Sequence, residues 1–454
     1  MRGNFRPLPR QRHVLFVQII ALVLILCISI LVPVSSRAYS VLTHEAIIDA
    51  VWEDGIKPLL IARFPAATED ELKEAYSYAY GGAIVADAGY YPFGNKFFSD
   101  LLHYVRSAEF VEALLRDSAD VNEYAFGLGA LAHYAADNNG HRLAVNLAVP
   151  MLYPKLARKF GNRVTYDQSP SSHLKTEFGF DVIQVAKGHY ASESYHHYIG
   201  FNVSKPALEK AFRDTYSMEL GSVFSNYDMA IGTFRRSVSS VIPEMTRAAW
   251  QNKKDDIQKD LPGTAKKKFI YNLSRADYEK EWHNQYMHQS FGSKIIALLL
   301  RLVPKIGPFR ALSFRMPTPE AEKIFMASFN ATLDQYKQLL HDSDAAREAA
   351  MSNINLDTGT ITGPGEYPLG DKTYAELLER LSKDHFAKVS PELKNVLLAY
   401  YANTNAPFAT KKKKKEWDKV MGEINELKST TPAGQPTSSS GKSDSATNRQ
   451  LRSS

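Results

Sequence analysis

His133, Asp137 and His141 lie four residues apart in the sequence AHYAADNNGHRLA. In an α-helix, four residues advance about 400° and rise about 6 Å, so the three side chains would share one helix face. The rise from His133 to His141 is about 12 Å, too far for two imidazoles with zinc–nitrogen bonds of about 2.0 to 2.1 Å to share one ion comfortably. The spacing therefore predicts two or more metal ions, with Asp137 placed to bridge between them.

Five further side chains of metal-binding type lie in the first half of the chain. His173 and Glu177 form a second pair at i, i+4, while Asp87, His103 and His44 lie upstream. One histidine on an apolar helix face is more often an ordinary core residue, and a His/Glu pair is often an exposed helix contact. The joint pattern favours metal, because a catalytic zinc site needs at least three protein ligands and these eight side chains supply almost three such sets. The same donor set also suits manganese or iron.

The first 38 residues have the character of a leader. A basic opening without acids precedes the apolar run 14–34, and the small residues Ser36 and Ala38 follow it. This pattern predicts a signal peptide cleaved after Ala38, with an uncleaved membrane anchor through residues 14–34 as the alternative. We therefore expect a secreted or periplasmic protein, or else a membrane-anchored one. The single cysteine, Cys27, lies in the leader, so the processed chain would contain no thiol.

Loss of this leader would change the charge balance. The chain has 55 basic and 49 acidic residues, and residues 1–38 carry five of the basic ones and no acid, so the net charge would fall from +6 to 50 − 49 = +1. Such a balance gives no reason to expect a stable nucleic-acid partner. The lysine run 411–415 is typical of a solvated helix face.

The remaining pattern predicts an all-α protein, because apolar residues recur at three- and four-residue spacing and no alternating strand pattern competes. We divide the chain into the leader (1–38), a catalytic domain (39–317), a helical extension (318–427) and a disordered polar tail (428–454). Residues 290–312 form either an amphipathic element at a membrane surface or a buried helix. The aromatic residues near Asp87 either line a substrate mouth or pack in the core: Tyr90, Tyr91, Phe93, Phe97 and Phe98.

Three local sequences carry a family resemblance: LTHEAI around His44, GGAIVADAGYYP around Asp87 and AHYAADNNGH around Asp137. In this order they resemble the zinc-dependent phospholipase C family. That family includes the bacterial phosphatidylcholine-hydrolysing enzymes and the phospholipase C/D domain at the start of glycosylphosphatidylinositol-specific phospholipase D. The resemblance covers roughly residues 39–185 by motif. It implies an all-helical phospholipase C/nuclease-like domain with three zinc ions.

The resemblance also implies which residues hold each ion. The first ion would be held by Asp87, His103, His133 and Asp137; the second by His141, His173 and Glu177; and the third by His44, Asp137 and the mature amino terminus at Tyr39. Family members typically carry a tryptophan at that terminus, where the backbone amine and carbonyl bind zinc. Tyr39 departs from the pattern in its side chain only, but its free amine depends on cleavage after Ala38.

The implied activity is that of an exported zinc-dependent hydrolase, which attacks phosphorus in a phospholipid with a zinc-bound hydroxide. Asp87 would serve as a ligand or as the general base. The expected partners are a phospholipid or another phosphodiester substrate, with peripheral membrane contact. Two alternatives stay open: a zinc-dependent single-strand nuclease of the same superfamily, and a non-catalytic, metal-stabilised membrane-associated protein.

Overall fold

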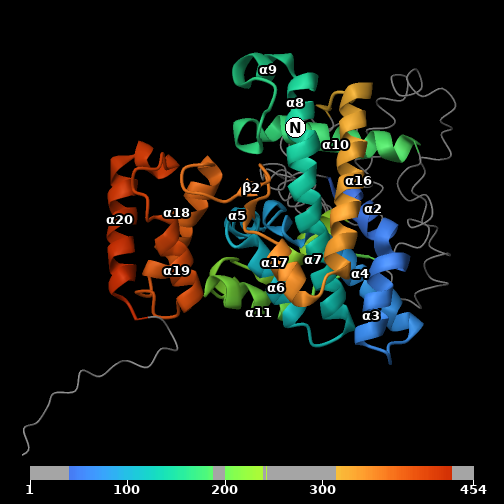
Figure 1. Cartoon of the computed structure of the whole chain (residues 1–454), viewed down its shortest axis with the longest axis horizontal. Helices are drawn as coiled ribbons and strands as arrows, with labels where there is room; N and C mark the ends of the chain where they lie inside the picture. Colours follow the sequence, from blue (N-terminus) through green and yellow to red (C-terminus); the bar gives the residue numbers. More distant parts are fainter. Residues whose placement is uncertain (1–39, 188–199, 239–241, 243–312, 432–454) are drawn as a thin grey trace, which may run out of the picture.

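Helices make up nearly all of the secondary structure in the computed structural model, which describes residues 40–187, 200–238, 242 and 313–431 (Figure 1). The predicted spacing of apolar residues gives these helices buried faces, and most of the faces meet in one hydrophobic core. Within the described residues, strands are limited to one antiparallel pair. The structure therefore confirms the all-α prediction.

The N-terminal helices follow one another through short connections. They are α2 (Val41–Val51), α3 (Lys57–Arg63), α4 (Glu69–Val85), α5 (Lys96–Tyr104), α6 (Ser107–Arg116), α7 (Val121–Asn139), α8 (Asn146–Leu152), α9 (Pro154–Phe160), α10 (Pro170–Lys187), α11 (Lys205–Tyr216) and α12 (Tyr227–Arg236). Between them lie the π-helical turns η1 (Trp52–Ile56) and η3 (Gly140–Val145) and the 3₁₀ turns η2 (Ala88–Tyr90), η4 (Tyr166–Gln168) and η5 (Leu220–Ser222).

The C-terminal part contains both helices and the strand pair. Its elements are α16 (Pro319–His341), α17 (Asp344–Ala350), β1 (Ile354–Asn355), β2 (Thr360–Ile361), α18 (Pro368–Ser382), α19 (Pro391–Tyr400), the 3₁₀ turn η9 (Ala409–Lys412) and α20 (Lys414–Ser429).

Helix α7 packs against α4, α6 and α16 and forms the centre of the fold (Figure 1). A Cβ atom added to Gly82 of α4 would lie 2.0 Å from the carbonyl oxygen of Phe126 in α7. Likewise, a Cβ atom on Gly129 of α7 would lie 2.1 Å from the carbonyl oxygen of Ala79. Glycine at these two positions allows the backbones to approach closely. This contact fixes α7 against the helix that leads to Asp87.

The expectation of one continuous α-helix from His133 to His141 is wrong at its C-terminal end. Helix α7 ends at Asn139, and Gly140–Val145 forms the π-helical turn η3. A π turn has more residues per turn than an α-helix, so the face shared by His133 and Asp137 does not continue unchanged to His141.

Helix α16 packs along α7, although it begins the predicted extension. The Tyr336 hydroxyl donates to the carbonyl oxygen of Leu128 at 2.9 Å, and the Asn139 amide donates to the side-chain oxygen of Gln335 at 2.7 Å. Their backbones run side by side in Figure 1. The first helix after residue 318 therefore shares the core of the N-terminal helices.

The strand pair after α17 also packs on the N-terminal helices. Ile354 of β1 lies opposite Ile361 of β2. Just after β1, the backbone N–H of Leu356 donates to the carbonyl oxygen of His103 at 3.1 Å. The hairpin thus meets the backbone of a predicted metal ligand.

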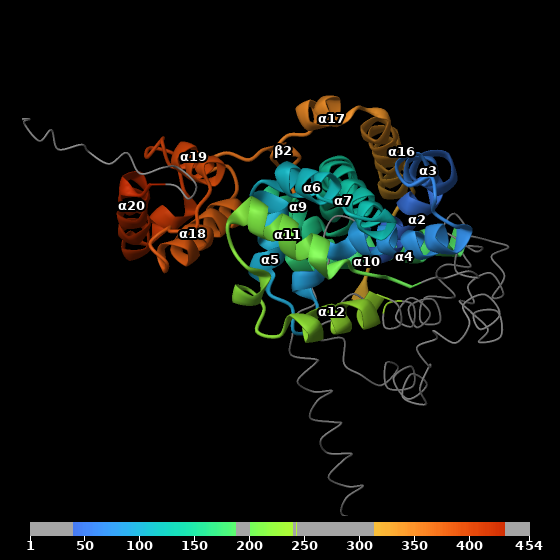
Figure 2. The same ribbon diagram turned by 90° about the horizontal axis from the view of Figure 1, so that it is seen from below.

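Helices α18, α19 and α20 form a separate group at one side of the molecule, seen in both views (Figures 1 and 2). The rings of Tyr374 and Tyr400 stack with centroids 3.6 Å apart inside this group. Its contact with the rest of the fold includes the Arg380 guanidinium, which lies 4.4 Å from the centroid of the Phe97 ring in α5. We call these three helices the C-terminal unit.

Several sequence predictions fall outside the described residues: the leader 1–38 with Tyr39, the segment 290–312 and most of the tail, from residue 432. Among the helices that are described, none has the length and apolar character needed to span a bilayer.

Candidate metal centre

The structure gathers the eight predicted side chains from 44 to 177 in the interior, where the most exposed is His133 at 3 %. They come from five helical elements and one connection: His44 from α2, Asp87 from the link after α4, His103 from α5, His133 and Asp137 from α7, His141 from η3, and His173 and Glu177 from α10. Three groups among them have potential ligand atoms within 4.8 Å of one another.

The first group consists of Asp87, His103 and His133. His103 Nε2 lies 3.6 Å from an oxygen of Asp87 and 3.4 Å from His133 Nε2. The group brings together the end of α4 with α5 and α7, whose relative position depends on the close α4–α7 contact.

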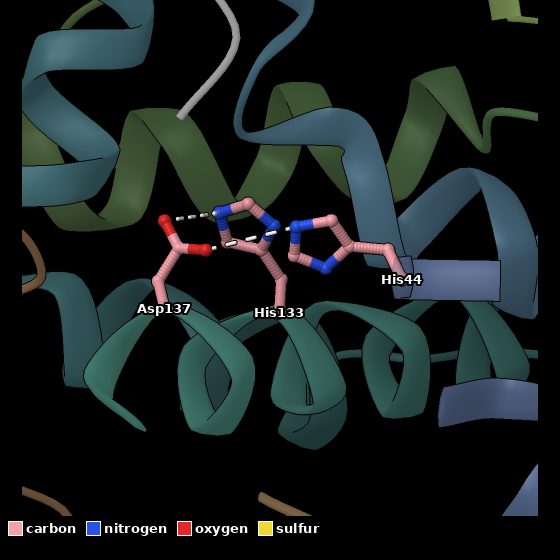
Figure 3. A group of neighbouring side chains, drawn as sticks. All are labelled: His44, His133 and Asp137. Carbon is pink, nitrogen blue, oxygen red and sulfur yellow. Dashed lines mark ion pairs between the residues drawn. The ribbon is translucent and has the colours of Figure 1, made fainter. Parts of the chain in front are cut away.

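Asp137 turns its two oxygens toward different histidines. Oδ2 lies 3.3 Å from His103 Nε2 and 3.4 Å from His133 Nε2, whereas Oδ1 lies 3.7 Å from His44 Nε2. Figure 3 shows the Asp137 carboxylate paired with both His133 and His44, whose rings stack with centroids 4.8 Å apart. The second group, His44, His133 and Asp137, therefore shares members with the first. One carboxylate facing two donor sets is the arrangement of a bridging ligand.

The third group consists of His141, His173 and Glu177. His173 Nδ1 lies 3.7 Å from an oxygen of Glu177 one turn later on α10, so the predicted i, i+4 pair faces one direction. The His141 ring from η3 lies 5.7 Å from the His173 ring, centroid to centroid.

Backbone carbonyls fix the orientation of three of these rings. His103 Nδ1 lies 2.7 Å from the carbonyl oxygen of Ser99, and His133 Nδ1 lies 2.9 Å from that of Ala83. His173 uses its other nitrogen, Nε2, which lies 2.7 Å from the carbonyl oxygen of Val164. A carbonyl can only accept, so each of these ring nitrogens carries a proton and the opposite nitrogen faces the group. Metal-binding histidines are usually oriented in this way.

Two features of the three groups fit a divalent cation. Facing nitrogens and carboxylate oxygens lie 3.3–3.7 Å apart. Tetrahedral zinc with bonds of about 2.0–2.2 Å places neighbouring ligand atoms about 3.3–3.5 Å apart. The donors are nitrogen and oxygen atoms, which zinc accepts, and buried carboxylates at this density need cations nearby.

The electrostatics agree with this fit. Burial, followed by repulsion from His133, lowers the pKa of His44 to about 3, which leaves its ring neutral as metal binding requires. Burial alone would also lower the pKa of His133, but the Asp137 carboxylate outweighs it and raises that pKa to about 9. Burial and then repulsion from Asp87 raise the pKa of Glu177 well above its usual value. The raised pKa values of His133 and Glu177 favour their protonated forms, and a divalent cation would displace these protons on binding.

Sequence reasoning missed two buried carboxylates. Asp181 accepts hydrogen bonds from the backbone N–H of Leu42 at 3.1 Å and from the Thr43 hydroxyl at 2.6 Å, and burial raises its pKa to about 6. Its spacing of one turn after Glu177 on α10 could have revealed it. Asp357 lies 3.3 Å from His141 and comes from a Gly/Thr-rich segment that carries no helical spacing, so no pattern pointed to it.

The aromatic residues near Asp87 mostly pack in the core. Tyr90, Tyr91, Phe97 and Phe98 are buried, whereas Phe93 is 55 % exposed. Of the five, only Phe93 is therefore placed to meet a substrate at the surface.

Comparison with known proteins gives one match. Residues 43–226 match the model of a family described as zinc-dependent phospholipase C. This range contains all eight side chains of the three groups and excludes Tyr39 and Asp357. No curated protein and no solved structure matches the chain.

Proposed function

Residues 43–226 belong to the zinc-dependent phospholipase C family, and from this premise we propose that the protein is an exported hydrolase that cleaves phosphodiester bonds in phospholipids. The observation that carries the proposal is the set of three buried His/Asp/Glu groups inside the matched range. Family membership supports phosphodiester hydrolysis, and the three groups could bind the zinc ions that this reaction needs.

Three zinc ions are the metal content that we propose. Asp87, His103 and His133 would hold one ion with Asp137, and His44 would join Asp137 at another. The remaining ion would be held by His141, His173 and Glu177. When bound, zinc lowers the pKa of coordinated water toward neutrality and neutralises charge on phosphoryl oxygens.

Side chains of this protein would orient the reaction around those ions. Asp137, with one oxygen toward His103 and the other toward His44, holds two donor sets at a fixed separation. Asp87 faces His103 at 3.6 Å and, as a carboxylate, can either bind metal or take a proton as general base. The backbone carbonyls behind the rings of His103 and His133 keep the other ring nitrogens aimed inward, where they would bind zinc.

We propose that the mature amino terminus completes the same centre. Ser40, which would follow Tyr39 after cleavage at Ala38, is buried, and its carbonyl oxygen accepts a hydrogen bond from the backbone N–H of Thr43 at 3.1 Å. Asp181 holds the next turn through Leu42 and Thr43. These contacts fix the first turn of α2, the helix that carries His44. Cleavage after Ala38 would put the free amine of Tyr39 directly before this turn in the sequence.

The exposed ring of Phe93 beside the Asp87 segment supports a lipid substrate, since an apolar side chain at the surface can contact acyl chains. The near-neutral charge expected after processing disfavours single-stranded DNA, which is usually bound by a basic groove. The test therefore compares these two substrates directly.

Purified protein is incubated with phosphatidylcholine in mixed micelles and, separately, with single-stranded DNA, and its zinc content is measured by mass spectrometry. We expect zinc-dependent release of phosphorylated product from the lipid only. In Asp137→Asn the rate should fall by at least about a hundredfold, because the substitution removes the charge shared by two donor sets. Asp371→Asn, a buried aspartate of the C-terminal unit, is the control and should keep its rate. Hydrolysis of DNA alone would replace the proposed substrate, and full activity of Asp137→Asn would overturn the proposed mechanism.

A further inference from the structure

Asp357, which lies outside the family match, contacts His141 of the third metal group. It follows β1 and is 0 % exposed. The side-chain amide of Asn146 donates to the carbonyl oxygen of Asp357 at 2.7 Å. The preceding residue, Leu356, is held by the carbonyl oxygen of His103. The backbone here is therefore fixed on both sides against the N-terminal helices.

Two tyrosines orient the Asp357 side chain. The hydroxyl of Tyr104 donates to Oδ2 at 2.8 Å, and the hydroxyl of Tyr367 donates to the same oxygen. The other oxygen, Oδ1, lies 3.3 Å from His141 Nε2. One oxygen is thus anchored by protein donors, while the other is aimed at a predicted metal ligand.

The distance of 3.3 Å distinguishes two roles for Asp357. Ring nitrogens that donate to an outer partner in this centre lie 2.7–2.9 Å from it, as at Ser99, Ala83 and Val164. Nitrogens that face a carboxylate of the three groups lie 3.3–3.7 Å from it. The contact between His141 and Asp357 belongs to the second set, which matches the separation of about 3.3–3.5 Å between two ligands of one tetrahedral zinc ion.

We propose that Asp357 is a protein ligand of the ion held by His141, His173 and Glu177. The inference rests on the proposed function only in requiring that this group binds a metal. Four protein ligands are typical of closed, structural zinc sites, whereas catalytic sites keep one position open. An ion bound there would also link the C-terminal hairpin to the N-terminal helices.

The first test measures how tightly zinc is held. Full-length zinc-loaded protein and its Asp357→Asn variant are titrated with a competing chelator, and the zinc remaining per chain is counted. We expect one zinc per chain to leave Asp357→Asn at a chelator concentration at least about tenfold lower than in the wild type. Asp371→Asn is the matched control, because Asp371 is also a buried aspartate that accepts a tyrosine hydroxyl, here from Tyr400 at 2.7 Å. Its zinc should be held as in the wild type.

The second test asks whether the side chain touches the metal. The chain has one cysteine, so Cys27→Ser gives a thiol-free background in which Asp357→Cys introduces a single thiol. After cobalt replaces zinc, a thiolate ligand at this position should produce a sulfur-to-cobalt charge-transfer band in the near ultraviolet. Asp371→Cys in the same background should produce none.

Each result decides between distinct outcomes. Weaker zinc binding by Asp357→Asn, together with the thiolate band in Asp357→Cys, supports the proposal. Weaker zinc without the band would assign Asp357 to an outer role behind His141, and unchanged zinc affinity would remove it from the centre; both overturn the proposal. A wild-type protein that binds no metal would instead sink the proposed function, so the two failures are distinguishable. Circular dichroism of each variant confirms that it is folded.

Discussion

Asp137 in α7 and Asp371 in α18 are both buried aspartates, but histidine rings surround the first carboxylate and hydrogen-bond donors surround the second. The oxygens of Asp137 face the nitrogens of three histidines at 3.3–3.7 Å. Those of Asp371 accept hydrogen bonds from the Tyr400 hydroxyl and from the backbone N–H groups of Gly365 and Ala409, at 2.6–2.9 Å.

The comparison shows that burial of a carboxylate does not by itself indicate a metal site. In the C-terminal unit, N–H and O–H groups donate hydrogen bonds to the buried carboxylate oxygens, as is usual for buried polar groups. In the metal centre, ring nitrogens lie near the carboxylate oxygens in positions from which both could bind a cation. Asp357 combines both modes, since one oxygen meets tyrosine hydroxyls and the other meets His141.

Metal removal should separate the two regions most strongly. Treatment with a zinc chelator should lower the Tm by about 20 °C or more, because the free energy of metal binding contributes directly to folding. Hydrogen exchange measured by mass spectrometry should rise in α7 and α10 and change little in α18–α20. Adding zinc should restore the Tm; equal loss of protection in both regions would contradict the comparison.

The close contact of α4 and α7 should be sensitive to any added side chain. Gly82→Ala places a Cβ atom against the Phe126 carbonyl, so we expect the free energy of unfolding to fall by about 3 to 4 kcal/mol. Gly422→Ala in α20 is the matched control, since no atom lies within 4 Å of the added Cβ. Denaturant unfolding should show that this control is unchanged or more stable by about 1 kcal/mol. Equal destabilisation by both changes would show that the close approach is unimportant.

Asp371→Asn should affect the C-terminal unit alone. An amide in place of the carboxylate puts an NH₂ group against N–H and O–H donors, which should cost about 1 to 3 kcal/mol. Thermal unfolding measures the loss, and zinc content should stay at the wild-type value. A variant that loses zinc would tie the two regions together more closely than their contacts suggest.

Helix caps should give the smallest effect and the same one in both regions. The Thr68 side chain accepts from the backbone N–H of Glu71 at the start of α4, and Ser390 accepts from that of Leu393 at the start of α19. Thr68→Ala and Ser390→Ala should each lower the free energy of unfolding by about 1 kcal/mol. Chemical denaturation checks both, and a loss several times larger at one site would show a role beyond capping.

Much of the fold and of the candidate site could be predicted because the information is local. Apolar residues at helical spacing determine which face of each helix is buried. The pairs His133/Asp137 and His173/Glu177 share helix faces for the same reason. The π-helical turn at Gly140 could not be read from spacing, since it changes the residues per turn without a distinctive composition.

The other omissions depend on contacts between distant parts of the chain. Asp357 is brought to His141 by hydrogen bonds that a sequence pattern does not encode, and its Gly/Thr-rich segment looks like an ordinary break between helices. Similarly, the packing of α16 on α7 depends on tertiary contacts such as that of Tyr336 with Leu128. The domain boundary at residue 318 therefore stays a prediction.

The hairpin after α17 has a consequence for the order of folding. The hydrogen bond from Tyr104 to Asp357 spans 253 residues of sequence, and that from Asn146 to Asp357 spans 211. Contacts this distant form slowly, because the intervening chain must first lose conformational freedom. Residues 44 to 177 all precede this segment in the chain and lie closer together in sequence. We therefore expect docking of the hairpin to be a late step in folding.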